Sequence, residues 1–176
     1  VLDGAAACTA VAAVVGGKEP EWGESKSVAA WRHPLIDRLG LEEALARLQV
    51  PLRITEPIDP NAGRECDQAE RDRQRAGIIA SFIGVTAADF CMADTATLVM
   101  RNRPGQPRSV ALVPSIHIAV ITLDQILADM KELFALLRWD ERYRTEGLSN
   151  YMSFISGPSK TADIEAIMVH GAHGPR

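Results

Sequence analysis

Cysteine is scarce in this sequence of 176 residues, which holds only Cys8, Cys66 and Cys91. The three are far apart and none belongs to a C-x-x-C pair, so we expect no disulfide scaffold, zinc site or iron–sulfur cluster carried by this chain alone. We interpret the thiols as small buried hydrophobic groups. We therefore expect no metal and no cofactor. The sequence shows no secretory signal, which favours a cytoplasmic protein.

Other features are missing as well. No apolar run reaches the roughly 18 residues that a membrane-spanning helix needs. Basic residues alternate with acidic ones, as in Glu70-Arg71-Asp72-Arg73, and the net charge is −4, so we expect no nucleic-acid partner. The G-x-G-x-x-G fingerprint of dinucleotide binding is absent too. With 47% hydrophobic residues, the chain is long enough to bury the core of one domain.

What the sequence does contain is an alternation of short apolar segments and helical patterns. We expect strands at 27–31, 51–55 and 97–100, one or two more around Pro114, and a last one at 164–170. Helices are expected at 5–15, 35–50 with a break at Gly40, 61–85, 122–137 and 148–157. This alternation predicts an α/β fold, a mostly parallel sheet flanked by helices. In such sheets ligands bind beyond the carboxyl ends of the strands.

Two polar stretches within this pattern look structural. The charged residues of the 61–85 helix, Arg71 and Arg75 among them, pair at helical spacing and are interpreted as a solvated face. The segment 101–109, "RNRPGQPRS", is interpreted as a turn.

A third polar stretch, 157–163, offers more chemistry. Glycine permits unusual backbone angles, hydroxyls and amides could converge on an anion, and a lysine adds a point charge. The stretch lacks the spacing of a P-loop, and an ordinary turn capped by its aspartate is the alternative. The residues concerned are Gly157, Ser159, Lys160, Thr161 and Asp163.

Further candidates lie at expected strand ends. Asp94, with Thr95 and Thr97, either stabilises a tight turn or presents a carboxylate to a site. His117 lies among apolar neighbours, which is more typical of a core histidine than of a ligand-binding one. His173, bracketed by glycines, has a ring suited to act as a base near pH 7. A metal site built from His117, His173 and Asp94 or Glu165 has no short-spacing signature to support it.

Three of these segments together resemble the signature blocks of the LUD-domain family: "GVTAADFCMADTATLVM", "RPGQPRSVALVPSIHIAVI" and "SGPSKTADIEAIMVHGAHGPR". The resemblance implies a single LUD domain over 1–176 that lacks a final C-terminal strand. Because the sequence begins at Val1 and not at a methionine, we also expect part of the N-terminus to be missing. The resemblance also implies a fold like that of sugar-phosphate isomerases and CoA transferases. The process it implies is bacterial L-lactate oxidation to pyruvate, alongside an iron–sulfur LUD-domain protein and a cysteine-rich redox subunit.

The resemblance also marks site residues. It points to Asp94, Thr95, Thr97 and His117 and ends with His173, Gly174 and Pro175. Between these it marks Gly157, Pro158, Ser159, Lys160, Thr161, Asp163 and Glu165. Two residues depart from the family pattern: Ala96 replaces an expected glycine, and Lys160 replaces the usual arginine, which loses bidentate anion recognition.

Three functions remain open, one of them a purely structural assembly protein whose polar blocks form an interface and not a pocket. We expect an accessory or regulatory subunit with a small-anion pocket, its oligomeric state undetermined and a homo-oligomer among the options. The alternative is a stand-alone isomerase or acyl/CoA-transfer enzyme, in which His173, Glu165 or Asp94 supplies the catalytic group.

Overall fold

The computed structural model describes residues 3–20, 26–58, 64–146, 151–157, 160–162, 168–170 and 175. It confirms an α/β fold with a parallel sheet flanked by helices. This first sheet has the strand order β2-β1-β3-β6 and every pairing in it is parallel. Its strands are β1 (Val28–Trp31), β2 (Leu52–Thr55), β3 (Ile83–Ala87) and β6 (Ile116–Val120). The central strands β1 and β3 are buried along their whole length, as expected of parallel strands covered on both faces.

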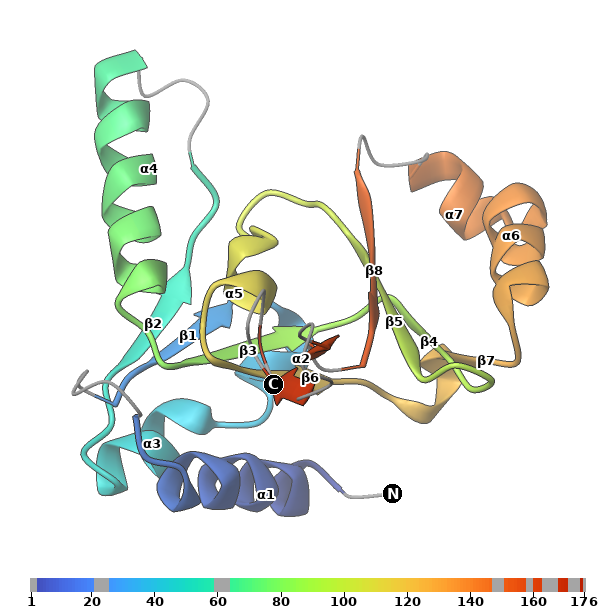
Figure 1. Cartoon of the computed structure of the whole chain (residues 1–176). Helices are drawn as coiled ribbons and strands as arrows, with labels where there is room; N and C mark the ends of the chain where they lie inside the picture. Colours follow the sequence, from blue (N-terminus) through green and yellow to red (C-terminus); the bar gives the residue numbers. More distant parts are fainter. Residues whose placement is uncertain are drawn as a thin grey trace.

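Helices cover both faces of the first sheet (Figure 1). On one side lie α1 (Gly4–Gly17), α2 (Pro34–Asp37) and α3 (Leu41–Arg47), and on the other α4 (Arg64–Ile79) and α5 (Ser109–Leu112). The break expected at Gly40 is confirmed, because Gly40 has a φ of 67° and separates α2 from α3. The short helix α5 packs very closely on β3. A Cβ added to Gly84 would lie 1.9 Å from the carbonyl oxygen of Val110.

A second sheet extends from the first, because β3 is followed after two residues by β4. Its strand order is β7-β4-β5-β8, from β4 (Phe90–Met92), β5 (Thr97–Arg101), β7 (Ile126–Leu127) and β8 (Met152–Ser156). It is mixed: β5 runs antiparallel to β4 and β8, while β4 and β7 are parallel. The helices α6 (Met130–Trp139) and α7 (Glu141–Glu146) follow β7, and β9 (Lys160–Ala162) pairs antiparallel with β10 (Met168–His170).

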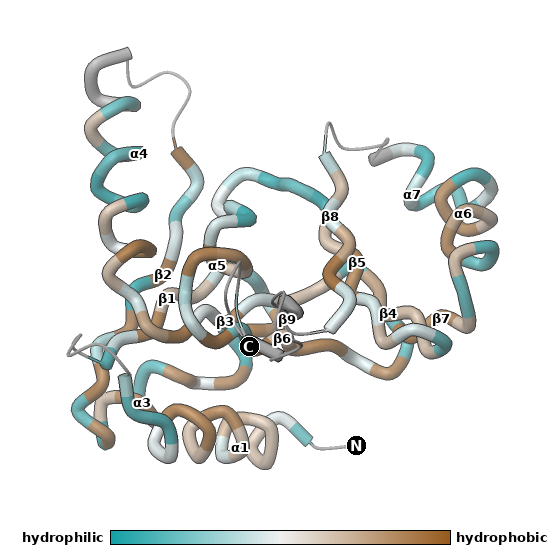
Figure 2. Tube along the Cα trace, in the orientation of Figure 1, coloured by the Kyte–Doolittle hydropathy of each residue, from teal (hydrophilic) through white to brown (hydrophobic). Residues whose placement is uncertain are grey.

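The apolar side chains form two buried clusters. The larger joins the first sheet to its helices, and its centre includes Val15, Val28, Leu45, Ile83 and Val85. The smaller lies between the second sheet and α6 and includes Phe90, Val99 and Leu133. In Figure 2 the strands of the first sheet are mostly brown, whereas the middle of α4 is mainly teal. Residues 68–77 of α4 are exposed or half-buried. No helix in the described part of the chain is both long and apolar enough to cross a bilayer.

Two helix predictions were wrong in the same way. The helix expected over 61–85 ends at Ile79, and Ile83 begins β3, the strand between β1 and β6. The helix expected over 148–157 is instead the strand β8, paired with β5. In both places an apolar run suits either structure locally. The extended form is stabilised by hydrogen bonds to neighbouring strands, from β3 to β1 and β6 and from β8 to β5.

The segment after β6 also differs from the prediction. The capping box is confirmed, since the Thr122 amide donates to Gln125 Oε1 over 2.7 Å. It starts only a 3-10 turn (Leu123–Gln125), however, and β7 follows. The long helix α6 begins at Met130, after the N-cap Asp129, whose carboxylate accepts from the Lys131 and Glu132 amides. The expected continuous core helix is therefore wrong, and Leu123 is 61% exposed.

Candidate functional site

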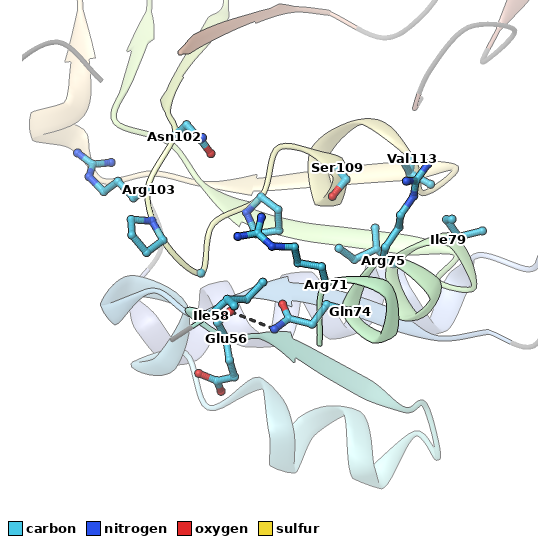
Figure 3. A pocket seen from close by; sticks show the side chains of 14 residues that line it. Glu56, Ile58, Arg71, Gln74, Arg75, Ile79, Asn102, Arg103, Ser109 and Val113 are labelled. Atoms are coloured by element: carbon cyan, nitrogen blue, oxygen red, sulfur yellow. Dashed lines mark hydrogen bonds between the residues drawn. The ribbon is translucent and has the colours of Figure 1, made fainter. Parts of the chain in front are cut away.

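A cavity of about 650 Å³ opens beyond the carboxyl end of β2, between α4 and the segment that joins β5 to α5. We call this cavity the arginine cleft (Figure 3). One wall is α4, with Arg71, Gln74 and Arg75, and the other is residues 102–113. Its position agrees with the general location of ligand sites in open α/β sheets.

Residues 103–107, which form part of one wall, are hydrogen-bonded to the carboxyl ends of β1 and β2. Thr55 Oγ1 donates to the Gly105 carbonyl oxygen over 2.6 Å, and Trp31 Nε1 donates to the Pro107 carbonyl oxygen over 2.9 Å. Gly105 has a φ of 76°, and a Cβ there would approach Pro57 to 3.0 Å. Only glycine therefore fits this turn without strain. These contacts hold the wall in place before any ligand arrives.

A carboxylate at the start of the second sheet orients the same segment. Asp89 Oδ2 accepts from the Arg101 amide over 2.7 Å, and Asp89 Oδ1 accepts from Arg101 Nε over 3.1 Å and Arg103 Nη2 over 2.7 Å. The side chains of Asp89 and Arg101 are only 9% and 3% exposed. In Figure 3 the Arg103 guanidinium turns away from the α4 wall. Arg103 thus supports the segment and also borders the cleft.

The charge inside the cleft is positive. Arg71 and Arg75 lie one helical turn apart and extend toward the opposite wall (Figure 3). The one acidic residue of the lining, Glu56, points its carboxylate away from the cavity, where it binds Arg32. That hydrogen bond lowers the pKa of the Glu56 carboxyl. Its backbone oxygen accepts from Gln74 Nε2 over 3.1 Å. The cleft is therefore suited to an anion.

Apolar side chains complete the lining. Ile58, Ile78, Ile79 and Val113 border the cavity, together with Pro104 and Pro107. Ile79 and Val113 are 57% and 48% exposed. A ligand that combines a negative group with an apolar or planar part would contact both kinds of surface.

The described residues among those predicted from sequence do not line the arginine cleft. Asp94, Thr95 and Thr97 occupy the tight turn between β4 and β5 in the second sheet. Thr95 Oγ1 donates to Asp94 Oδ1 over 3.1 Å, and Thr97 Oγ1 donates to Thr95 Oγ1 over 2.8 Å. Ala96, where the family glycine is expected, has a φ of 50°. The described contacts of Asp94 are those of a turn, which was one of its two interpretations.

His117 lies in the first sheet, opposite Gly84 on β3. Its Nε2 is 2.8 Å from the Thr86 hydroxyl oxygen, and burial lowers the pKa of its imidazole to about 4. A neutral histidine with a hydrogen-bond partner matches the core interpretation. No described contact joins it to the Asp94 turn, which belongs to the other sheet.

The C-terminal candidates are described only in part. Gly157 follows β8 with a φ of 74°, the left-handed conformation that glycine favours. Lys160 and Thr161 begin the strand β9, of which the backbone is described. Ser159, Asp163, Glu165 and His173 lie outside the described residues, so their part in an anion site stays a prediction. Among the residues that are described, no three His, Cys, Asp or Glu side chains group closely enough to hold a metal ion.

Sequence reasoning missed the arginine cleft. It interpreted Arg71 and Arg75 as part of a solvated face and 101–109 as a simple turn. One signal was present: Arg71 and Arg75 share a helix face with Ile78 and Ile79 at spacings of three and four. A face that mixes cations with apolar side chains is less typical of plain solvent exposure.

Comparisons with known proteins agree with the blocks identified in the sequence. The model of the LUD domain matches residues 3–176. "Lactate utilization protein C" of Halalkalibacterium halodurans is 32% identical over 151 residues, covering 86% of this chain and 60% of that protein. Its namesake in Shouchella clausii is 34% identical over 152 residues, covering 86% and 59%. The chain thus spans about three fifths of these relatives.

A comparison of structures gives a weaker match. The crystal structure of a DUF162 family protein from Deinococcus radiodurans aligns with a TM-score of 0.43 and 19% identity, covering 100% of this chain and 95% of that one.

Proposed function

Because the chain belongs to the LUD-domain family, we propose that it acts in L-lactate utilization as an accessory or regulatory subunit that binds a small anion in the arginine cleft. The observation that carries the proposed process is the similarity to two proteins named lactate utilization protein C, each matched over 86% of this chain. The observation that carries the proposed binding role is the placement of Arg71 and Arg75 in one cavity.

An accessory role is favoured over electron transfer by what these 176 residues contain. They hold no cysteine cluster and no dinucleotide fingerprint, the usual means by which a chain holds an iron–sulfur cluster, a flavin or a nicotinamide. In this proposal the electrons of lactate pass through partners in the cytoplasm. These partners are an iron–sulfur protein that carries its own LUD domain and a cysteine-rich redox subunit.

Growth tests the proposed process. Deleting the gene that encodes this chain should abolish or strongly slow growth on L-lactate as sole carbon source, while growth on glucose stays normal. Restoring the gene should restore growth on lactate. Equal growth of the deletion strain on both carbon sources would exclude the proposed role.

The same strain tests whether the cleft matters for that role. Restoring the gene with both Arg71→Ala and Arg75→Ala should leave growth on lactate impaired. Arg73→Ala is the matched control, because Arg73 lies on the same helix but pairs with Glu70 outside the cleft. Arg73→Ala should restore growth fully.

A further inference from the structure

We infer that the outer side of α6 pairs with the same helix of a second copy of this chain, antiparallel across a two-fold axis at Ala135. This surface is separate from the arginine cleft, because α4 and residues 102–113 border the cleft, whereas α6 packs on the second sheet. The inference therefore goes beyond the proposed function and does not depend on it.

The exposed sides of α6 carry large apolar side chains. Leu133 and Leu137 face inward and pack in the smaller buried cluster, and α6 lies at the rim of the molecule, beyond the second sheet (Figure 1). On its other sides Met130, Phe134 and Trp139 are 43%, 53% and 74% exposed. Exposed apolar side chains that gather on one ten-residue helix are typical of an interaction surface.

The same surface also has a hollow. It is a cavity of about 520 Å³ lined by Phe134, Ala135, Leu137, Arg138 and Trp139. Two exposed aromatic side chains thus border a depression on one helix. Such a surface can be complementary to itself, because a two-fold axis places the projecting side chains of each copy in the depression of the other.

The order of charges on α6 favours an antiparallel pair. Because a helix has 3.6 residues per turn, Ala135 lies opposite the two buried leucines. Glu132 and Arg138 lie three residues before and after it, and all three are exposed. In an antiparallel pair centred on Ala135, Glu132 of each copy faces Arg138 of the other, so two ion pairs form. A parallel pair would instead place each charge opposite its own copy.

The next residues outward match as well. Lys131 and Trp139 lie four residues before and after the axis, so the antiparallel pair brings the ammonium group of each copy to the indole of the other. A lysine over the face of a tryptophan is a favourable cation–π contact. Within the part of the chain that the structure describes, neither Lys131 nor Arg138 forms an ion pair that dimerisation would have to break. The Glu132 carboxylate accepts from the Ala128 amide over 2.5 Å and keeps its charge.

The small side chain of Ala135 suits the centre of such a pair. Packed helices have axes about 8–10 Å apart, depending on the side chains at the contact, and an alanine at the crossing point permits the shorter distance. The contact between two helices of this length is small, and small interfaces are typical of weak association. We therefore expect a dimer whose population rises with protein concentration.

Sedimentation velocity of the purified protein from about 1 to about 500 μM, where weak dimers assemble, tests the inference. The wild type should pass from monomer to dimer, whereas Ala135→Arg, which places two cations at the axis, should stay monomeric. Ala76→Arg is the matched control, because Ala76 is an exposed alanine on α4, and it should dimerise like the wild type. A wild type that stays monomeric, a dimer that survives Ala135→Arg, or equal loss of the dimer in both variants would overturn the inference.

Charge reversal tests the antiparallel register. Glu132→Arg and Arg138→Glu should each weaken self-association about tenfold or more, because each variant places like charges opposite one another at two positions. An equimolar mixture of the two variants should dimerise again, since both contacts of the mixed dimer then join opposite charges. Thermal unfolding verifies that each variant is folded. Folded variants that still self-associate like the wild type, or whose mixture stays monomeric, would overturn the antiparallel pair.

Discussion

The Thr55 hydroxyl donates a 2.6 Å hydrogen bond to the carbonyl oxygen of Gly105, 50 residues further along the chain. This bond joins the carboxyl end of β2 to the turn that forms one wall of the arginine cleft. Thr55 is only 4% exposed, so no water can readily replace the hydroxyl. A strand end and a loop remote in sequence thus form one rigid unit.

Replacing Thr55 by valine should loosen that wall. Valine keeps the shape of threonine but leaves the Gly105 carbonyl without its donor, a loss of about 1–3 kcal/mol in the free energy of unfolding. Hydrogen exchange of the Gln106 amide, which donates to the Arg103 carbonyl oxygen over 3.0 Å, should become faster. Thr55→Ser, which keeps the hydroxyl, should preserve slow exchange at that amide. Unchanged exchange in Thr55→Val would mean that the bond does not hold the loop.

Replacing Asp89 by asparagine should lower the free energy of unfolding more than most polar substitutions in this chain. It removes the charge opposite the buried Arg101 and the support of Arg103, and breaking a buried ion pair from one side costs about 3–5 kcal/mol. Chemical denaturation measures the loss. Glu43→Gln, which disturbs the exposed pair with Arg47 on α3, should cost only about 0.3–0.5 kcal/mol. Similar losses in the two variants would contradict the role given to Asp89.

Glycine at position 96 should stabilise the fold. Ala96 has a φ of 50°, a left-handed conformation that costs an alanine roughly 1–2 kcal/mol. Ala96→Gly removes that cost but adds freedom to the unfolded chain, so we expect a net gain of about 1 kcal/mol at most. Ala93→Gly, in the same turn but without a positive φ, should instead lower stability. A loss in both variants would contradict strain at Ala96.

His117 should make the fold sensitive to acid. Burial lowers the pKa of His117 from 6.5 to about 4, so between these values the unfolded chain binds a proton that the folded chain excludes. The contribution of His117 to the free energy of unfolding is therefore fully present above pH 6.5. It is lost as the pH falls from 6.5 toward 4. His117→Gln, which can still bond Thr86, should lack this dependence.

The measurement is the free energy of unfolding of both proteins at pH 7 and at pH 4.5. The wild type should lose about 2 kcal/mol more than His117→Gln over that interval. The second half-buried histidine, His33, also has a pKa lowered by burial, but it is present in both proteins and cancels in the comparison. If the free energies of unfolding of both proteins fall equally between pH 7 and pH 4.5, His117 binds a proton in the folded chain as readily as in the unfolded chain, and the prediction is wrong.

Some of the fold could be predicted because it is encoded locally. The strands at 28–31 and 52–55 and the helix break at Gly40 were each marked by a short apolar run, a proline or a glycine. The helix-to-strand boundary between Ile79 and Ile83 was not. Its apolar residues satisfy either structure, and only pairing of β3 with β1 and β6 decides between them.

The sequence alone determined the α/β class and the family, because composition, periodicity and signature blocks are properties of neighbouring residues. The tertiary structure alone decided which polar residues meet. Arg71 and Arg75 line a cavity only because the 102–113 segment lies opposite them, held by hydrogen bonds from Thr55 and Trp31. A cavity is formed between segments that are distant along the chain, and no local sequence pattern predicts how close they lie in space.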